Sequence, residues 1–540
     1  MEDTGKLAAV VAAAVAELEA AVTGSAADLL REDLLVVEQR LQAIFRQVGS
    51  VVGSGVLQAR AAGSEGQATR CPACGGRLHL VGAARTRTVL GLVGEYHFTR
   101  PTFTCGVCPA GYAPLDEALG LGTARLSPAL AQVLCRAAAA LPFAEAGAQV
   151  PGSLGVAVDA ETIRRLAEGM GAVIEHDQAD RTTWALPQAA VPACLLVEAD
   201  GVPTPLLDGY HETKVGRVAA LGPTRRTDPE TGRVTLVAQP SSFCSTLEGT
   251  DAFFPRLTRD AWRAGFTRGV RQVVFIADGA EWIWQQARTQ FSAPGVEVVE
   301  ILDYYHACEH LAAVARAVHD AEPIRAATWF ADQRHALLHQ GPAPILAALD
   351  ACHAPDADRA PDADRAPDAD RALDESARDL VRRTHAYFTT HAARMDYPTV
   401  AARHFPLGSG AIESACKLLI SQREKLSGMR WSPAGAQHTA NLRALSCSGR
   451  ERWAIFWTSH PLARARRLAL LAPPLPALLP PPPAEELIPP PLLLAPCAAA
   501  TDPPAAPAAS ATTRIATAGK PWAKGKDHWR RRPLAHPRSA

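Results

Sequence analysis

The spacing of hydrophobic residues changes from a helical period early in the chain to short apolar runs in its middle. Apolar positions within residues 1–60 recur every three or four residues and end in the glycines of VGSVVGSG, which predicts an amphipathic helix or a helix pair. Residues 125–172 show the helical period again, on both sides of a turn at residues 151–155. Two helices joined in this way have the outline of a helix-turn-helix, which any helical hairpin also has.

The middle of the chain predicts a sheet. The runs Leu195–Val197 and Val273–Ile276 are short and wholly apolar, which is typical of strands buried on both faces. Strand-length segments at residues 213–221 and 234–243, a helix at about 247–264 and a fifth strand from about residue 297 complete the pattern. Three strands, a helix and two further strands form the ribonuclease H-like order. We therefore expect an α/β ribonuclease H-like catalytic core with a helical insertion at about residues 321–405.

Two of these strands end in an aspartate. Asp200 and Asp278 follow the first and fourth strands, and ligands of α/β sheets bind at the carboxyl ends of strands. Glu413 lies in the first turn of a later helix that follows Gly408-Ser409-Gly410. The alternative is that Asp278 caps the next helix and that Glu413 forms a capping box with Ser409. Three carboxylates also suit Mg²⁺ (or Mn²⁺) ions, which prefer hard oxygen ligands.

Four cysteines form two close pairs. Cys71 and Cys74 are separated by two residues, as are Cys105 and Cys108, and 30 residues lie between the pairs. Two such knuckles predict a closed, structural Zn²⁺ site, and the alternating residues between them predict a hairpin, so this segment is interpreted as a zinc ribbon. Histidines 79 and 97 could replace a thiolate, although a lone histidine near a hairpin is more often a packing or surface residue.

Composition narrows the setting rather than the function. The 540 residues carry 55 basic and 55 acidic side chains, so net charge gives no hint of a nucleic-acid partner. Twelve cysteines are few for this length and favour metal ligation in a reducing compartment. The Ala-rich start is interrupted by Glu17 and Glu19, and we expect no membrane segment and a cytoplasmic protein.

Low-complexity segments interrupt the pattern in two places. The hexapeptide APDADR occurs three times in residues 354–371, which predicts an exposed linker. Residues 473–508 are dominated by Pro, Ala and Leu, and residues 514–538 are basic with two tryptophans. This tail is expected to be disordered or polyproline-like, and its basic end suits either transient nucleic-acid contact or simple solvation.

Two groups of side chains are candidates for DNA contact. On the second helix of the helix-turn-helix outline, Arg164 and Arg165 could enter a groove. The second group follows Glu413, and its members could bind phosphates, with the tryptophan stacking on an unpaired base; the alternative is an ordinary basic helix face. It consists of Lys417, Arg423, Lys425, Arg430 and Trp431.

Several segments together resemble a known family. They are CPAC with CGVC, VEADGV, HETKVGRV, FIADGAEWIW, ILDYYHACEHL, GSGAIESACK and SGMRWSPAGAQHTANLRAL. This combination, over roughly residues 70–460, resembles the DDE transposases of bacterial insertion sequences, most closely the ISKra-type family. The resemblance implies a catalytic Asp, Asp, Glu triad at Asp200, Asp278 and Glu413. Asp303-Tyr304-Tyr305-His306 resembles the family's [C/D]xxH motif, which implies a role for His306 near the scissile phosphate; the alternative is a histidine packed beside Tyr304.

The leading hypothesis is therefore a transposase. It would cleave the ends of its own insertion sequence and join them to target DNA, acting on double-stranded DNA as a homo-oligomer in the bacterial nucleoid. The expected regions are 1–66 (helical), 67–120 (zinc ribbon), 121–190 (helical, DNA-binding), 191–460 (catalytic) and 461–540 (tail). The alternatives are a non-catalytic zinc-containing DNA-binding protein, either a decayed transposase or a repressor, and a nuclease that cleaves without strand transfer.

Overall fold

The protein is a mixed α/β molecule. The computed structural model describes residues 2–62, 70–109, 111–121, 125–179, 191–227, 232–239, 241–319, 322–353, 374–459 and 461–465. The chain divides into two compact units, Met1–Pro473 and Pro474–Ala540, and the described residues all belong to the first. The APDADR repeats and the low-complexity tail predicted after residue 473 lie outside the described residues.

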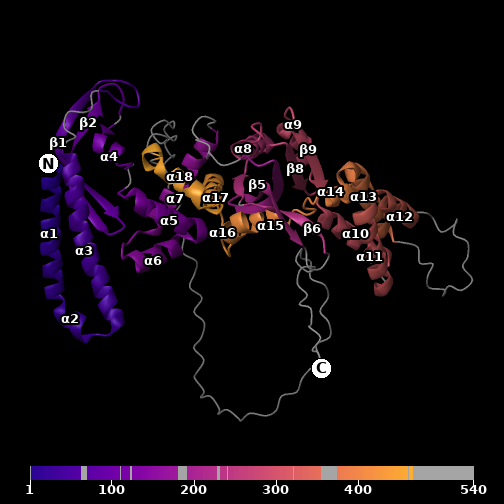
Figure 1. Ribbon diagram of the computed structural model, residues 1–540, viewed down its shortest axis with the longest axis horizontal. Coiled ribbons are helices and arrows are strands. Elements are labelled where there is room, and N and C mark those ends of the chain that lie inside the picture. The colour runs from indigo at the N-terminus through magenta and orange to yellow at the C-terminus, as the bar shows by residue number, and fades with distance from the viewer. Residues whose placement is uncertain are drawn as a thin grey trace, which may run out of the picture. The chain divides into compact units, whose positions relative to one another are not determined.

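The N-terminal region is helical, as predicted. Helices α1 (Glu2–Gly24), α2 (Ala26–Arg31) and α3 (Leu34–Ala61) follow one another, and α1 lies along α3 (Figure 1). Asp33 caps α3, because its carboxylate accepts a hydrogen bond of 3.1 Å from the amide of Val36.

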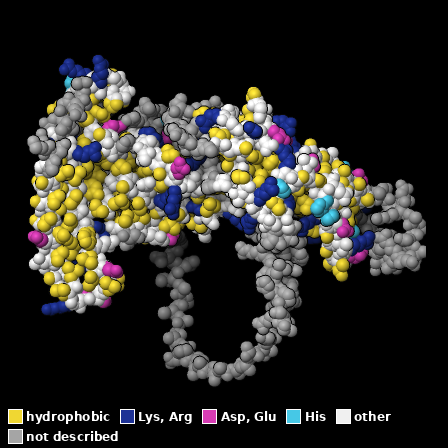
Figure 2. Space-filling view, viewed as in Figure 1, with side chains coloured by type: hydrophobic (Ala, Val, Ile, Leu, Met, Phe, Trp, Pro, Cys, Tyr) yellow, Lys and Arg dark blue, Asp and Glu magenta, His cyan; other side chains and the backbone are white. Residues whose placement is uncertain are grey.

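This helical pair keeps much of its hydrophobic surface exposed. Figure 2 shows hydrophobic side chains gathered over α1 and α3, and the exposed ones include Val11, Leu34 and Phe45. The stretch Gly5–Gly24 is long and apolar enough to cross a membrane by length and composition, and none of it is buried. This is weak evidence for a membrane segment, because core helices and signal sequences have the same length and composition.

A β-hairpin packs against α3. Strands β1 (Leu78–Gly91) and β2 (Gly94–Cys105) pair antiparallel, β3 (Gly111–Tyr112) extends the sheet, and α4 (Pro114–Ala118) follows. The ring of Tyr96 occupies the space that a side chain at Gly53 would need, so the hairpin approaches the helix closely. A buried ion pair between Arg100 and Asp116, with bonds of 3.0 and 2.8 Å, joins β2 to α4.

Three further helices form a second core. They are α5 (Pro128–Ala140), α6 (Phe143–Leu154) and α7 (Ala160–Ala179). The predicted cap of α7 is confirmed, since Asp159 accepts a 2.9 Å bond from the amide of Thr162. The turn is shorter than predicted, because α6 continues to Leu154 and ends at Gly155, whose φ of +66° suits glycine. Residues of two C-terminal helices, α17 (Pro433–Cys447) and α18 (Arg450–Thr458), complete this core.

The central sheet is mixed. Its strands are β4 (Cys194–Leu206), β5 (Gly209–Thr227), β6 (Val234–Ala238), β7 (Ser242–Thr246), β8 (Gln272–Ala277) and β9 (Glu297–Leu302). The order is β6-β5-β4-β8-β9, and β7 also pairs with β5. Strands β4 and β5 are antiparallel, whereas β4, β8 and β9 run parallel. The third strand predicted at residues 234–243 is in fact two strands, and Pro240, which cannot donate to a ladder, falls between them in the sequence.

Helices cover the sheet and bury its apolar runs. Those that follow the strands are α8 (Thr250–Arg263), α9 (Glu281–Phe291) and α10 (Tyr304–Val318). Their buried residues, among them Phe253, Ile283 and Leu311, share one hydrophobic core with the fully buried strand residues Val273–Ile276. Burial on both faces explains why β8 has no polar residue between Gln272 and its carboxyl end.

Helices are observed where the helical insertion was predicted, at about residues 321–405. They are α11 (Pro323–Gln340), α12 (Ala343–His353), α13 (Glu375–His391), the 3₁₀ turn η3 (Ala392–Arg394) and α14 (Tyr397–Ala402). The chain then forms α15 (Gly410–Cys416), the π-helical turn η4 (Lys417–Ser421) and α16 (Gln422–Glu424) without a break, before α17. Single π turns occur mostly at functional sites.

Candidate functional site

The register of two parallel strands brings Asp200 and Asp278 to one edge of the sheet. Glu198 of β4 is paired with Ile276 of β8. Two residues further along stand Asp200 and Asp278, at equivalent positions in the register. Asp278 follows the last residue of β8, as predicted, whereas the predicted strand end at Asp200 is wrong, because β4 continues to Leu206 beside β5. The residues just before them are fully buried, whereas both aspartates are partly exposed. This edge is where an α/β sheet binds ligands.

Asp278 does not cap α9 in the usual way. Its Oδ1 accepts a 3.0 Å bond from the amide of Ala280, the residue before the helix begins, and no side chain caps α9. Its carbonyl accepts a 2.7 Å bond from the indole of Trp284. The alternative of a helix-capping aspartate is therefore wrong, because the carboxylate stabilises the turn after β8 rather than the first turn of α9.

Glu413 stands in the first turn of α15, as predicted, and is partly exposed. The predicted capping role of Ser409 is wrong, because its hydroxyl and its amide both donate to Oδ2 of the buried Asp303. A capping-box glutamate would accept a bond from that same amide. This amide donates to Asp303 instead, so the predicted alternative that Glu413 forms a capping box with Ser409 is wrong as well.

Helix α15 lies against β4, the strand that carries Asp200. The thiol of Cys416, three residues after Glu413, lies 3.5 Å from Oδ2 of Asp200. Residues three apart share a face of a helix, so Glu413 is on the side of α15 that faces this strand.

The three carboxylates lie on neighbouring elements, but their oxygen atoms do not form one compact group. A single metal ion needs ligand atoms that all lie close to one another. Among the described residues, the four cysteines are the one group of three or more potential ligands whose atoms all lie within 4.8 Å of one another. Asp200, Asp278 and Glu413 are therefore farther apart than the ligands of one bound ion.

A histidine and tyrosine cluster lies beside Asp278. His306, at the start of α10, is 3.6 Å from Glu309, which raises the pKa of His306; Asp278 acts in the same direction and burial opposes it. His310 stacks on Tyr387 of α13 with ring centroids 4.2 Å apart, and burial together with the charge of His306 lowers its pKa to about 4.

Tyr387 reaches the strand end from the insertion. Its ring fills the space that a side chain at Gly279 would need, and its hydroxyl is buried without a hydrogen-bond partner in the described part of the chain. Burial raises its pKa, as do the charges of Asp278 and Asp303. The sequence analysis missed Tyr387 and its neighbour His391, because no motif surrounds them and about 110 residues separate them from Asp278.

The predicted DNA-contacting residues occupy different environments. Arg164 and Arg165 on α7 both form ion pairs with Glu161 at 2.7 Å, which offsets part of their charge. In the second group, Lys417, Lys425 and Arg430 are exposed, whereas Arg423 is fully buried and Trp431 is 8% exposed. Neither side chain of this buried pair lies on the outer surface.

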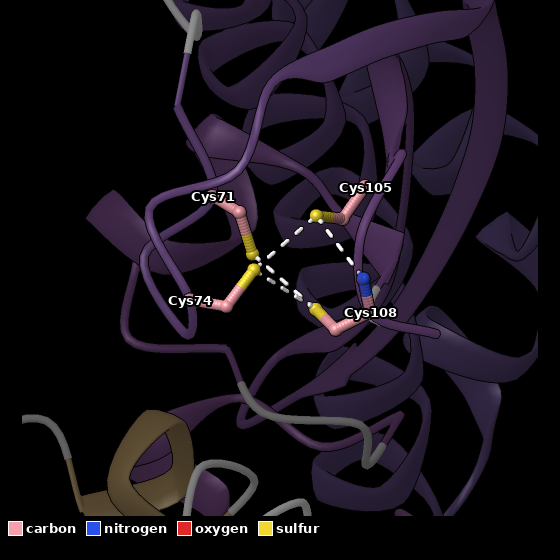
Figure 3. A group of neighbouring side chains, drawn as sticks. All are labelled: Cys71, Cys74, Cys105 and Cys108. Carbon is pink, nitrogen blue, oxygen red and sulfur yellow. Dashed lines mark hydrogen bonds between the residues drawn. The ribbon is translucent and has the colours of Figure 1, made fainter.

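The four cysteines form the one compact group of potential metal ligands in the described residues (Figure 3). Their side chains point toward one another from the turn before β1 and from the end of β2. Sulfur atoms are 3.7 Å apart for Cys71 and Cys108, 3.4 Å for Cys74 and Cys105, and 3.5 Å for Cys74 and Cys108. Four thiolates around zinc at about 2.3 Å stand about 3.8 Å apart in a regular tetrahedron. The cluster could therefore hold zinc.

The backbone around the cluster favours thiolates. The amides of Val107 and Cys108 point at the sulfur of Cys105 from 3.3 and 3.5 Å. These two bonds, that from Cys108 first, lower the pKa of Cys105 to about 6. The amide of Gly76 likewise lowers the pKa of Cys74, but the bonds with Cys105 and Cys108 outweigh it and raise that pKa to about 12, so the proton stays on Cys74 when Cys105 ionises. Gly75, with φ of +73°, closes the first knuckle, in which its amide donates to the carbonyl of Cys71. The histidines considered as substitutes are not part of this ligand group.

Comparison with known proteins adds no identification. No protein-family model matches the chain, and no curated protein shows significant sequence similarity to it.

Proposed function

We propose that the protein is a DDE transposase that cleaves the ends of its own insertion sequence and joins them to target DNA. The observation that carries this proposal is the register of β4 and β8, which brings Asp200 of β4 level with Asp278 at the carboxyl end of β8. Helix α15, with Glu413, packs against the first of these strands.

The strand order supports a ribonuclease H-like core. The third, second and first strands of such a core are antiparallel neighbours, and the fourth and fifth continue the sheet parallel to the first. Here β6 and β7, then β5, β4, β8 and β9, take those places. The insertion between β9 and α15 accounts for the long separation between Asp278 and Glu413.

The carboxylates suit divalent metal chemistry. Asp200, Asp278 and Glu413 would hold two Mg²⁺ or Mn²⁺ ions, which supply activation of water or a 3′-hydroxyl and stabilisation of the leaving oxygen in an in-line displacement. Two ions about 3.5–4 Å apart have ligands spread over a wider span than one ion does, so the three carboxylates need not meet at one point. The partly exposed position of all three leaves room for a phosphate.

Other residues of the proposal act around this edge. His306 lies near Asp278 and would contact the scissile phosphate or the flanking DNA. The cysteine cluster, as a zinc ribbon, and Arg164, Arg165, Lys417, Lys425 and Arg430 would hold double-stranded DNA. Arg423 and Trp431 would act from the interior rather than from the surface.

The test is replacement of one carboxylate. Asp278→Asn keeps the shape of the side chain and the bond to Ala280, but removes the charge that a metal ion needs. We expect Mg²⁺-dependent cleavage of transposon-end DNA to fall below detection, whereas end binding in a gel-shift assay stays unchanged. Asp379→Asn, on the exposed face of α13, is the control and should cleave normally. Unchanged cleavage by Asp278→Asn would sink the assignment.

A second candidate is a zinc-containing DNA-binding protein without catalysis. The four-cysteine cluster favours it, because this is the compact group of potential metal ligands in the described residues and it needs no catalytic carboxylates. The same assay separates the two, since a pure binder shifts the end DNA and never cuts it. A nuclease would cut but would never join the 3′ end to target DNA.

A further inference from the structure

A pocket of about 310 Å³ lies between the helical core and the segment that follows Glu413. We call it the Arg423 pocket. Its walls combine aromatic rings with charged side chains, namely Phe143, Trp431, Arg164, Glu168, Arg423 and Arg430. Its volume is at the lower end of the range for small-ligand sites, about 300–1,000 Å³, and it fits a single nucleotide unit rather than a duplex.

Arg423 is fully buried in the wall of this pocket, and among the described residues only the Nε–H of its guanidinium group has a hydrogen-bond partner. Its Nε donates a 2.8 Å bond to the carbonyl of Ala138. Its guanidinium carbon stands 4.6 Å from the ring centre of Phe143 and 5.1 Å from that of Trp431. The other two nitrogens, Nη1 and Nη2, have no hydrogen-bond partner among the described residues.

An unpaired guanidinium in the interior is costly. A buried donor without a partner costs about 1–3 kcal/mol, and more when it is charged. The adjacent Glu424 is also fully buried and acts on Arg423 through its charge alone, because neither of its carboxylate oxygens forms a hydrogen bond with a described residue. Packing alone does not explain why a guanidinium group occupies this buried position.

The rest of the lining is positive. Glu168 is already paired with Arg164, at 2.6 Å. Arg430 is exposed at the rim, and its Nη1 lies 3.5 Å from the carbonyl of Leu206, a weak neutral contact. The pocket therefore has three arginines and one glutamate, and the charges of Arg423 and Arg430 are not balanced by a carboxylate in its lining.

We propose that the Arg423 pocket binds the phosphate of a nucleotide, with the free edge of Arg423 and the side chain of Arg430 as donors. A guanidinium fork matches two phosphate oxygens at once, and the ring of Phe143 offers an apolar wall for the sugar or base. The nucleotide belongs either to a DNA strand or to a free nucleoside monophosphate. The strand is the source that the proposed function requires, and to that extent the inference rests on it.

The test uses the full zinc-loaded chain and two probes, thymidine monophosphate and a fluorescent five-nucleotide thymidine strand. Arg430→Gln removes the rim donor without disturbing the interior, and Arg423→Lys keeps the charge but loses the fork. Arg383→Gln, an exposed arginine of α13 outside the pocket, is the matched control. Thermal unfolding of each variant shows whether the fold is kept, and if Arg423→Lys does not fold, Arg430→Gln carries the test.

We expect Arg430→Gln, and a folded Arg423→Lys, to lower affinity for the strand about tenfold, the effect of losing one charged hydrogen bond, while the control changes it less than twofold. Similar losses with the monophosphate show that one nucleotide suffices, and losses with the strand alone assign the phosphate to a strand. Equal effects of Arg430→Gln and the control, or no binding of either probe, would overturn the inference.

Failure of the two proposals can be told apart. If nucleotide binding depends on Arg430 but the protein cleaves no transposon ends, the pocket proposal is supported and the transposase proposal is rejected. If end cleavage is normal and Arg430→Gln does not change nucleotide binding, only the pocket proposal is rejected.

Discussion

Asp303 joins two parts of the protein that are distant in the sequence. Its Oδ1 accepts bonds from the amides of Tyr305, at 2.7 Å, and His306, at 3.3 Å, and so caps α10. Its Oδ2 accepts from the amide of Ser409, at 3.0 Å, and from the Ser409 hydroxyl. One buried carboxylate therefore fixes both the start of α10 and the start of the helix that carries Glu413.

The histidine of α10 that stacks on Tyr387 makes stability depend on pH. The pKa of His310 is lowered to about 4, so the folded state takes up its proton later than the unfolded state, whose pKa is about 6.5. The contribution is fully present above pH 6.5 and is lost as the pH falls toward 4. At pH 4.5 the loss amounts to about 2 kcal/mol.

Replacement of His310 by Phe should remove this dependence. Phenylalanine keeps the ring contact with Tyr387 but cannot bind a proton. We expect the drop in unfolding free energy between pH 7 and pH 4.5, measured with urea, to shrink by about 2 kcal/mol. The two proteins should agree at pH 7 within about 1 kcal/mol. An unchanged drop would show that His310 is not the group responsible.

At the scale of elements, the cysteine hairpin is the part whose stability we expect to depend on a metal ion. The knuckles before β1 and at the end of β2 meet through four sulfur atoms, and few apolar side chains surround them. A metal ion bound by the four cysteines would therefore supply much of what holds the two turns together.

We expect about one zinc ion per chain by metal analysis. The double variant Cys71→Ser and Cys74→Ser should contain none, because two ligands cannot hold the ion tightly. Cys447→Ser, a change of a partly buried cysteine outside the cluster, should retain zinc. Zinc that persists in the double variant would place the metal elsewhere.

The elements that the sequence predicted well are those with a local signal. Buried runs predicted β4 and β8, the two CxxC spacings predicted the cysteine cluster, and Asp159 marked the start of α7. The errors arose where a distant residue decides the outcome. Ser409 has the sequence of a helix cap, yet Asp303, about a hundred residues earlier, takes both of its donors. No local pattern contains that information.

The same limit applies to side chains that the insertion adds to the site. Tyr387 and His391 come from α13, and only the packing of that helix brings them to Asp278. Arg423 is the opposite case, because its position among basic residues predicted a surface, whereas the fold buries it. Charge in a sequence predicts exposure on average, and the exceptions are the positions to examine for ligands.

At the scale of the whole first unit, α17 connects the sheet to the helical core. Gln437 bonds to the carbonyl of Ser245 in β7 and, at 2.9 Å, to the side chain of Asn441. Asn441 in turn donates to the carbonyl of Gly171 in α7, at 3.4 Å. Helix α17 thus joins α7 to the sheet. The predicted boundary at residue 190 therefore separates two regions that share a hydrophobic core.

The close crossing of α7 and α17 depends on glycine at position 171, which has no side chain. A Cβ at Gly171 would overlap the backbone carbonyl of His438 in α17, and backbone cannot move aside as a side chain can. Gly169, two residues earlier in the same helix, has nothing within 4 Å of such a Cβ. The two glycines therefore form a matched pair for substitution by alanine.

Gly171→Ala should lower the free energy of unfolding by about 1–3 kcal/mol, because the added methyl group forces the two helices apart. Gly169→Ala should raise it by up to about 1 kcal/mol, since alanine favours a helix over glycine. Urea unfolding followed by circular dichroism measures both. Because α7 carries Arg164 and Arg165 and α17 holds the sheet, the first variant should also weaken end binding. Opposite signs from the same substitution two residues apart would show that close packing of α7 on α17, and not helix propensity, holds this unit together.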